Sequence, residues 1–235
     1  MQDDSPATAN LPDPVLSDTR PEAVRTKPLL RGWLHCAGAV GAVAATIGLL
    51  IQSAGDTAQQ IAFLIFGLSM VLLYVVSSIY HLGNWHGRRE ILIRAFDHAN
   101  IFVFIAGAYT PFCVIMLTGW AQVAMLTTIW LLAALGVAFS LITLRLPRWV
   151  MISLYIGMGW LSLVLLPEIA AQLSFVPVLV LVSGGLCYTV GALIYAMRWP
   201  DPFPRLFGYH ELFHLLVVGG TVSTTVTIWV WLLPL

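Results

Sequence analysis

Long apolar stretches separated by short polar loops constrain this chain of 235 residues more than any other feature. A helix that crosses a bilayer needs about 20 mostly apolar residues. Suitable segments fill nearly all of the chain after residue 31, and only 9% of the residues are charged, against roughly 25% in a soluble domain. The sequence therefore predicts an all-α polytopic membrane protein with seven transmembrane helices. The expected helices are 33–53, 60–81, 96–117, 120–143, 149–167, 175–197 and 209–233.

Lysine and arginine alternate between the two sides of this predicted bundle. All 11 lie before the first segment or in the loops that follow the second, fourth and sixth segments. Because cytoplasmic loops carry the excess of Lys and Arg, the pattern predicts a cytoplasmic N-terminus and a C-terminus outside the cell. It also supports the number of helices, since one helix more or fewer would break the alternation.

The first thirty residues differ from the rest. Residues 1–30 are polar, acidic and rich in proline, and they lack the apolar core of a signal peptide. We expect a disordered cytoplasmic tail, followed by one transmembrane domain over 31–235. The net charge of zero gives no reason to expect nucleic acid as a partner. The expected partners are the bilayer and a lipid that serves as substrate or ligand.

Ionisable residues inside the predicted spans mark a candidate site, because they are costly in hydrocarbon and usually functional. Asp97 and Glu211 are the acidic residues within these segments. With the predicted orientation, His81, Asp97 and His210 lie at the cytoplasmic ends of the second, third and seventh segments. His214 lies one turn deeper than His210, by about 6 Å.

The spacing of these histidines suggests a metal site. His210 and His214 are four residues apart and share a helix face, as do Ser77 and His81. A metal would satisfy imidazole nitrogens that hydrocarbon leaves without partners. Zn²⁺ binds imidazoles in tetrahedral geometry, and a catalytic site keeps one position for water. Three histidines, with a water that hydrogen-bonds Asp97, would complete such a site.

The other histidines fit simpler interpretations. His35 begins the first segment and His86 lies in a charged loop, so both are expected to reach water. His98 follows Asp97 but points about 100° away on a helix, toward an outer layer of the site or an interface.

Five stretches resemble the hemolysin III family, which is similar to the progestin and adipoQ receptors and, more distantly, to alkaline ceramidases. The stretches are SSIYHL at 77–82, FDHANIFVFIAGAYTPF at 96–112, YIGMGW at 155–160, GGLCYTVGALIYA at 184–196 and FGYHELFHLLVVGG at 207–220. The resemblance implies a seven-helix fold in a bacterial inner membrane, with zinc near the cytoplasmic face. The family's name comes from a lytic activity.

The resemblance also implies a role for each matching residue. His81, His210 and His214 would bind zinc, Asp97 would bind or orient the zinc water, and Ser77 would support an oxygen in the transition state.

HELFH also matches the metalloprotease pattern H-E-x-x-H, in which Glu211 would be the general base. The match is short, and no His, Asp or Glu follows His214 to act as a downstream third ligand. Glu211 also points about 100° from His210 on a helix. A structural or outer-layer role is therefore the stronger expectation for Glu211.

These observations leave several hypotheses for function. The first is a zinc-dependent hydrolase of lipid-like amides or esters, with Asp97 as general base. The second is a membrane sensor or regulator without enzymatic activity, in which zinc ties helices together. An intramembrane metalloprotease is less favoured. Direct pore formation is disfavoured because the spans are nearly uncharged away from this site.

Overall fold

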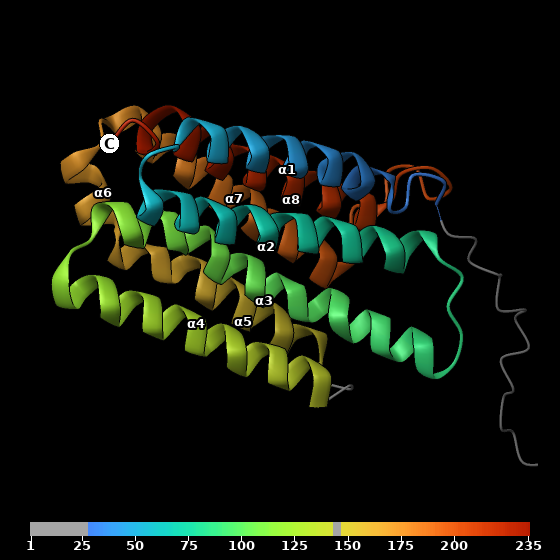
Figure 1. Ribbon diagram of the computed structural model, residues 1–235. Helices are drawn as coiled ribbons and strands as arrows, with labels where there is room; N and C mark the ends of the chain where they lie inside the picture. Colours follow the sequence, from blue (N-terminus) through green and yellow to red (C-terminus); the bar gives the residue numbers. More distant parts are fainter. Residues whose placement is uncertain (1–27, 143–146) are drawn as a thin grey trace, which may run out of the picture.

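The computed structural model describes residues 28–142 and 147–235, so nearly all of the predicted tail lies outside the described residues. The described chain is a bundle of α-helices joined by short connections (Figure 1). The helices are α1 (Trp33–Gln52), α2 (Thr57–Leu82), α3 (Arg88–Met116), α4 (Gly119–Ile142), α5 (Arg148–Trp160), α6 (Leu166–Gln172), α7 (Phe175–Met197) and α8 (Tyr209–Thr227). A 3₁₀ turn (Leu161–Val164) separates α5 from α6, and a π-helical turn (Ile228–Leu232) follows α8.

Helices α1, α2, α3, α4, α7 and α8 are each long and apolar enough to cross a membrane. Helices α5 and α6 meet at a bend of 45°, and counted together as one broken span they are the candidate for a seventh crossing. This confirms the all-α polytopic fold. The first described residues and the C-terminus lie at opposite ends of the bundle, as an odd number of crossings requires (Figure 1). The side that faces the cytoplasm stays a prediction from the arginine and lysine pattern.

The fifth span is broken, whereas the sequence predicted one helix over 149–167. The cause is Pro167 in the first turn of α6. Proline has no N–H to donate, and its ring clashes with the carbonyl four residues earlier, here that of Leu163. The chain therefore passes through the 3₁₀ turn before the helix resumes and continues to Gln172.

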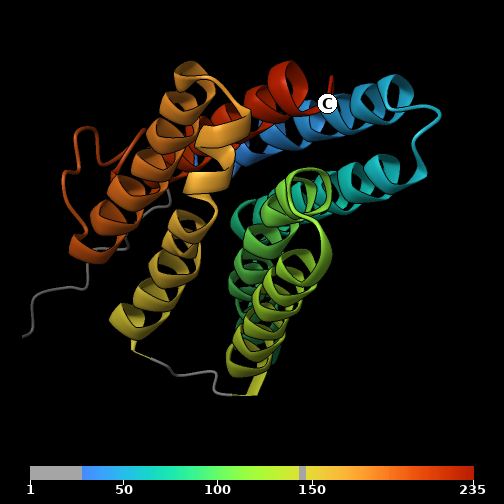
Figure 2. The ribbon, with the colours of Figure 1, turned by 90° about the vertical axis from the view of Figure 1, so that its left-hand side faces the viewer.

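Helices α2 and α3 are the most deeply buried of the six single-helix candidate spans. In their most apolar windows 56% and 67% of the residues are buried, against 17% for α7. Figure 2 shows α1, α7 and α8 on one side, α2 to α4 on the other, and α5 beside them. Gly107 lets α3 approach α2 closely, because a Cβ atom at this position would overlap the Ser69 side chain of α2.

Residues just before α1 are tied to the loop between α7 and α8. The Leu29 N–H donates to the Arg205 carbonyl at 3.1 Å, and the Leu30 N–H donates to the Leu206 carbonyl at 3.3 Å. These bonds hold the beginning of α1 against the beginning of α8. Residues of α1 therefore lie near the candidate site, which the sequence analysis had built only from residues of α2, α3 and α8.

Candidate metal centre

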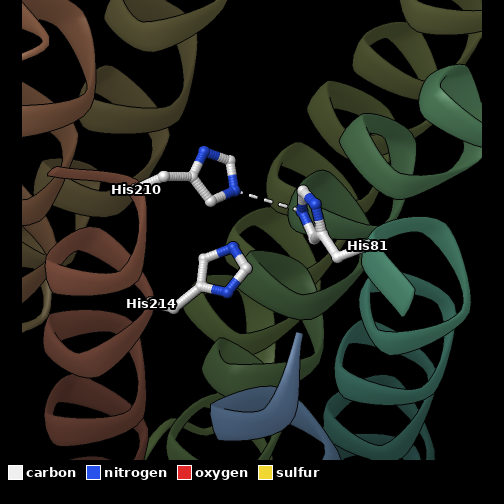
Figure 3. A group of neighbouring side chains, drawn as sticks. All are labelled: His81, His210 and His214. Atoms are coloured by element: carbon white, nitrogen blue, oxygen red, sulfur yellow. Dashed lines mark hydrogen bonds between the residues drawn. The ribbon is translucent and has the colours of Figure 1, made fainter. Parts of the chain in front are cut away.

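Three histidines from two helices meet at one end of the bundle. His81 comes from the last turn of α2, and His210 and His214 come from the first two turns of α8. Figure 3 shows both α8 rings turned toward His81. The Nε2 atoms of His210 and His81 are 3.1 Å apart. One nitrogen from each ring can be chosen so that all three lie within 4.8 Å of one another.

This three-histidine group has the chemistry and spacing of a metal site. Imidazole nitrogens suit zinc, copper, iron and nickel. Two ligands in a tetrahedral site with bonds near 2.0–2.1 Å lie about 3.3 Å apart, close to the 3.1 Å between His210 and His81. His81 and His214 are buried and His210 is partly buried. The group could therefore hold a metal ion.

Asp97 of α3 and Ser77 of α2 border the same cavity as the three histidines. Ser77 lies one helical turn before His81 on the same helix. The structure thus brings all five residues that the sequence singled out to one cavity.

The cavity has a volume of about 800 Å³, and most of the side chains that line it are apolar. Ligand pockets typically measure about 300–1,000 Å³ and are mainly hydrophobic with a few polar groups. Among the lining residues are Leu73, Ile101, Phe104, Leu181 and Val217, from α2, α3, α7 and α8. The cavity can accommodate an apolar chain beside the histidines.

Both carboxylate oxygens of Glu211 accept hydrogen bonds from residues outside the three-histidine group. The side chain is only 1% exposed. Oε1 accepts a hydrogen bond of 2.8 Å from Nε of Arg31, and Oε2 accepts one of 2.8 Å from the Gly208 N–H at the start of α8. A carboxylate in this position is favoured by the partial positive charge of the helix N-terminus. These contacts fasten the segment before α1 to α8.

The expectation for His35 was wrong. This side chain is 3% exposed and does not reach water. Neither ring nitrogen has a hydrogen-bond partner among the described residues. Its ring stacks on His214, with centroids 3.8 Å apart and planes inclined by 8°. The signal was available, because His35 lies at the predicted cytoplasmic end of its segment, like His81 and His210. Its burial, however, depends on how α1 packs.

The other two histidines lie outside the three-histidine group. His86 is exposed in the loop between α2 and α3, as expected. His98 lines the cavity, and its Nδ1 lies 2.6 Å from the carbonyl oxygen of Arg94. Its own carbonyl accepts a hydrogen bond of 3.0 Å from the Tyr155 hydroxyl. His98 therefore connects α3 to α5 at the cavity wall.

The fold and the site define a class of protein: a polytopic all-α membrane protein with histidines gathered between helices. The chain belongs to the Haemolysin-III related family, whose sequence model matches residues 23–225. Hemolysin-3 of Bacillus cereus is 33% identical over 204 residues, which cover 85% of this chain and 89% of that protein. The Hemolysin-3 homolog of Bacillus subtilis (strain 168) is 32% identical over 193 residues, covering 80% and 86%.

The similarity extends beyond bacteria. The human Monocyte to macrophage differentiation factor is 26% identical over 188 residues, which cover 78% of this chain and 76% of that protein. These findings confirm the family resemblance. Together with the apolar helices, they make the chain a multi-pass bacterial membrane protein.

Proposed function

We propose that this protein is a zinc-dependent hydrolase of lipid-like amides or esters, with its site at the depth of the cytoplasmic leaflet. One observation carries the proposal. The three-histidine group, Asp97 and Ser77 all face one cavity of about 800 Å³ that is otherwise mainly apolar. Such a cavity suits a substrate with a polar carbonyl group and a long hydrocarbon chain.

His81, His210 and His214 would hold the zinc ion. When bound, zinc polarises a carbonyl group and lowers the pKa of water to near 7. The Asp97 carboxylate would accept a proton from the attacking water and return it to the leaving amine or alcohol. The Ser77 hydroxyl would first orient that carboxylate and then donate to the carbonyl oxygen as negative charge develops there. The apolar wall would align the substrate chain and exclude water.

The hydrogen bonds of Glu211 argue against the metalloprotease alternative. A general base must reach the water it deprotonates, whereas both oxygens of Glu211 are occupied by Arg31 and by the Gly208 N–H. The same pattern of residues, H-E-x-x-H, therefore serves here as two ligand positions and one structural acid.

A structural role for zinc, in a sensor or regulator, is supported by a different observation. His81 is on α2, whereas His210 and His214 are on α8, and these two helices pack against each other only weakly. A shared ion would therefore add a tie between parts of the bundle that have few other contacts, and structural metal sites contribute folding energy directly.

The substitution Asp97→Asn separates the two proposals. For a hydrolase, the purified zinc-loaded variant should keep its metal and lose turnover by about 100-fold or more, because general bases contribute roughly 10²–10⁴-fold. Turnover is measured as fatty acid released from ceramide-like and other acyl-amide or ester lipids. Metal content is measured by mass spectrometry of the protein in detergent.

The wild-type protein provides the decisive control. Zinc-loaded wild type that releases no product from a broad lipid panel, while chelation lowers its thermal stability, would support the structural role and end the hydrolase proposal. Wild type that binds no metal at all would end both.

A further inference from the structure

His35 has three properties that its position at the start of α1 does not explain. It is 97% buried, since only 3% of the residue is exposed. Both ring nitrogens lack hydrogen-bond partners among the described residues. One ring face lies against His214, and the His35 and Tyr74 rings meet in a T-shaped contact with centroids 5.0 Å apart and planes inclined by 67°. Buried polar groups without partners are rare, and each calls for an explanation.

The stack itself restricts what His35 can do. An imidazole binds a metal through a nitrogen lone pair that lies in the plane of its ring. The rings of His35 and His214 are nearly parallel, inclined by 8°, so their lone pairs lie in separate, almost parallel planes. His35 therefore cannot bind the same ion as His214 without leaving the stack. It is not a member of the three-histidine group.

An ion pair fixes the register of the stack. Arg31 precedes His35 by four residues, and Glu211 precedes His214 by three. The 2.8 Å bond between Nε of Arg31 and Oε1 of Glu211 therefore aligns α1 and α8 at the level of the two imidazoles. Leu29 and Leu30 add backbone bonds to the loop before α8. The contact between His35 and His214 is thus held from outside the pair.

We propose that His35 is a positioning residue of the metal centre: its ring face fixes the plane of His214 and leaves the metal's fourth position free. This inference rests on the proposed metal site. Groups that orient a metal ligand change metal affinity by about 10–100-fold although they do not touch the ion. The two rings are in contact face to face, and this contact supplies such a restraint on the ring plane of His214. The stack also keeps His35 from closing the site with a fourth imidazole.

Two substitutions test the ring face against the nitrogens. His35→Ala removes the face and should weaken Co²⁺ or Zn²⁺ binding about tenfold. It should also shift the visible absorption of the Co²⁺ protein, because His214 can then tilt. His35→Phe keeps a ring face without nitrogens and should preserve both the absorption spectrum and the metal affinity to within about twofold. Metal affinity is measured by competition with a chromophoric chelator in detergent.

Leu49→Ala provides the matched control on the same helix. Leu49 is fully buried in α1 but far along the helix from His35. This variant should lose thermal stability and keep its metal affinity, whereas His35→Ala should lose metal affinity.

Each remaining outcome overturns the inference. If His35→Phe loses metal as His35→Ala does, the nitrogens are required and His35 is a ligand. If His35→Ala binds metal like wild type, the stack has no role and the proposed metal site still stands. If wild type binds neither ion, the metal site itself fails and the inference fails with it.

Discussion

The two halves of α8 contain polar side chains that satisfy their hydrogen bonds in different ways. In the second half, the hydroxyls of Thr221, Thr224, Thr225 and Thr227 each donate to the carbonyl four residues earlier in the same helix. In the first half, His210, Glu211 and His214 turn toward other segments of the chain. Their contacts are with His81, Arg31 and His35.

This difference separates polar residues that a membrane helix can tolerate from those that indicate a site. A threonine that bonds its own backbone needs no partner from another helix, so it carries little information about function. His98 behaves like the threonines, because its Nδ1 lies 2.6 Å from the carbonyl oxygen four residues earlier. The imidazoles of His81, His210 and His214 face one another instead, and only this arrangement is suited to a shared ion.

The largest effect should come from removing a proposed metal ligand in the first half of α8. His214→Ala should reduce metal affinity by more than the roughly 100-fold that changes outside the ligand set can cause. Metal content after purification provides the measurement. His86→Ala is the matched control, since His86 is an exposed histidine outside the group. Equal metal content in the two variants would show that the three-histidine group is not the binding site.

A substantial loss of stability is expected for Glu211→Ala. Breaking a buried ion pair typically costs 3–5 kcal/mol, and about 3 kcal/mol is expected here because Arg31 retains 23% exposure and some contact with solvent. The change also removes the acceptor for the Gly208 N–H at the start of α8. Denaturant unfolding in detergent measures the free energy.

Glu211→Gln sharpens the same test. The amide keeps an acceptor oxygen and loses the charge, so its loss of stability should be smaller than that of Glu211→Ala. A Glu211→Gln protein with wild-type stability and metal content but no hydrolysis would instead make Glu211 a general base, and the protease pattern would return.

The smallest effect should come from the second half of α8. Thr224→Val removes a hydroxyl that donates to the Gly220 carbonyl of its own helix at 3.1 Å. Side-chain hydrogen bonds between membrane helices average about 0.6 kcal/mol. We expect this bond within one helix to contribute no more, so the free energy of unfolding should change by less than about 1 kcal/mol. The same unfolding experiment measures it. A loss as large as that of Glu211→Ala would contradict the distinction between the two halves.

Much of this architecture follows from one-dimensional patterns. Apolar length predicted the spans because a bilayer has a set thickness. Six single helices are long and apolar enough to confirm six of them, and the bent pair of α5 and α6 is the candidate for the seventh. The broken fifth span was not predicted, although Pro167 was visible. An apolar window measures length and composition, and it does not register that a single proline interrupts the hydrogen bonds of a helix.

The candidate site also has some features that the sequence predicted and others that it did not. Helix periodicity placed His210 with His214 and Ser77 with His81, since residues four apart share a face. Periodicity alone gave no reason for α2 and α8 to bring these two pairs to one cavity. That expectation came from their common predicted depth and from the family resemblance. His35 and Arg31 were missed because their importance arises from contacts with residues 179 and 180 positions away in the chain.

The amino-acid order alone determined that this protein is helical, crosses the membrane repeatedly and places several histidines at one depth. Hydropathy and the positions of arginine and lysine suffice for that, because they act residue by residue against the bilayer and its surfaces. Only the tertiary structure decided that Glu211 pairs with Arg31 and that His35 stacks on His214. It also decided that the three-histidine group lines a mainly apolar cavity. Those results depend on how whole helices pack, and packing is settled by contacts between residues far apart in the chain.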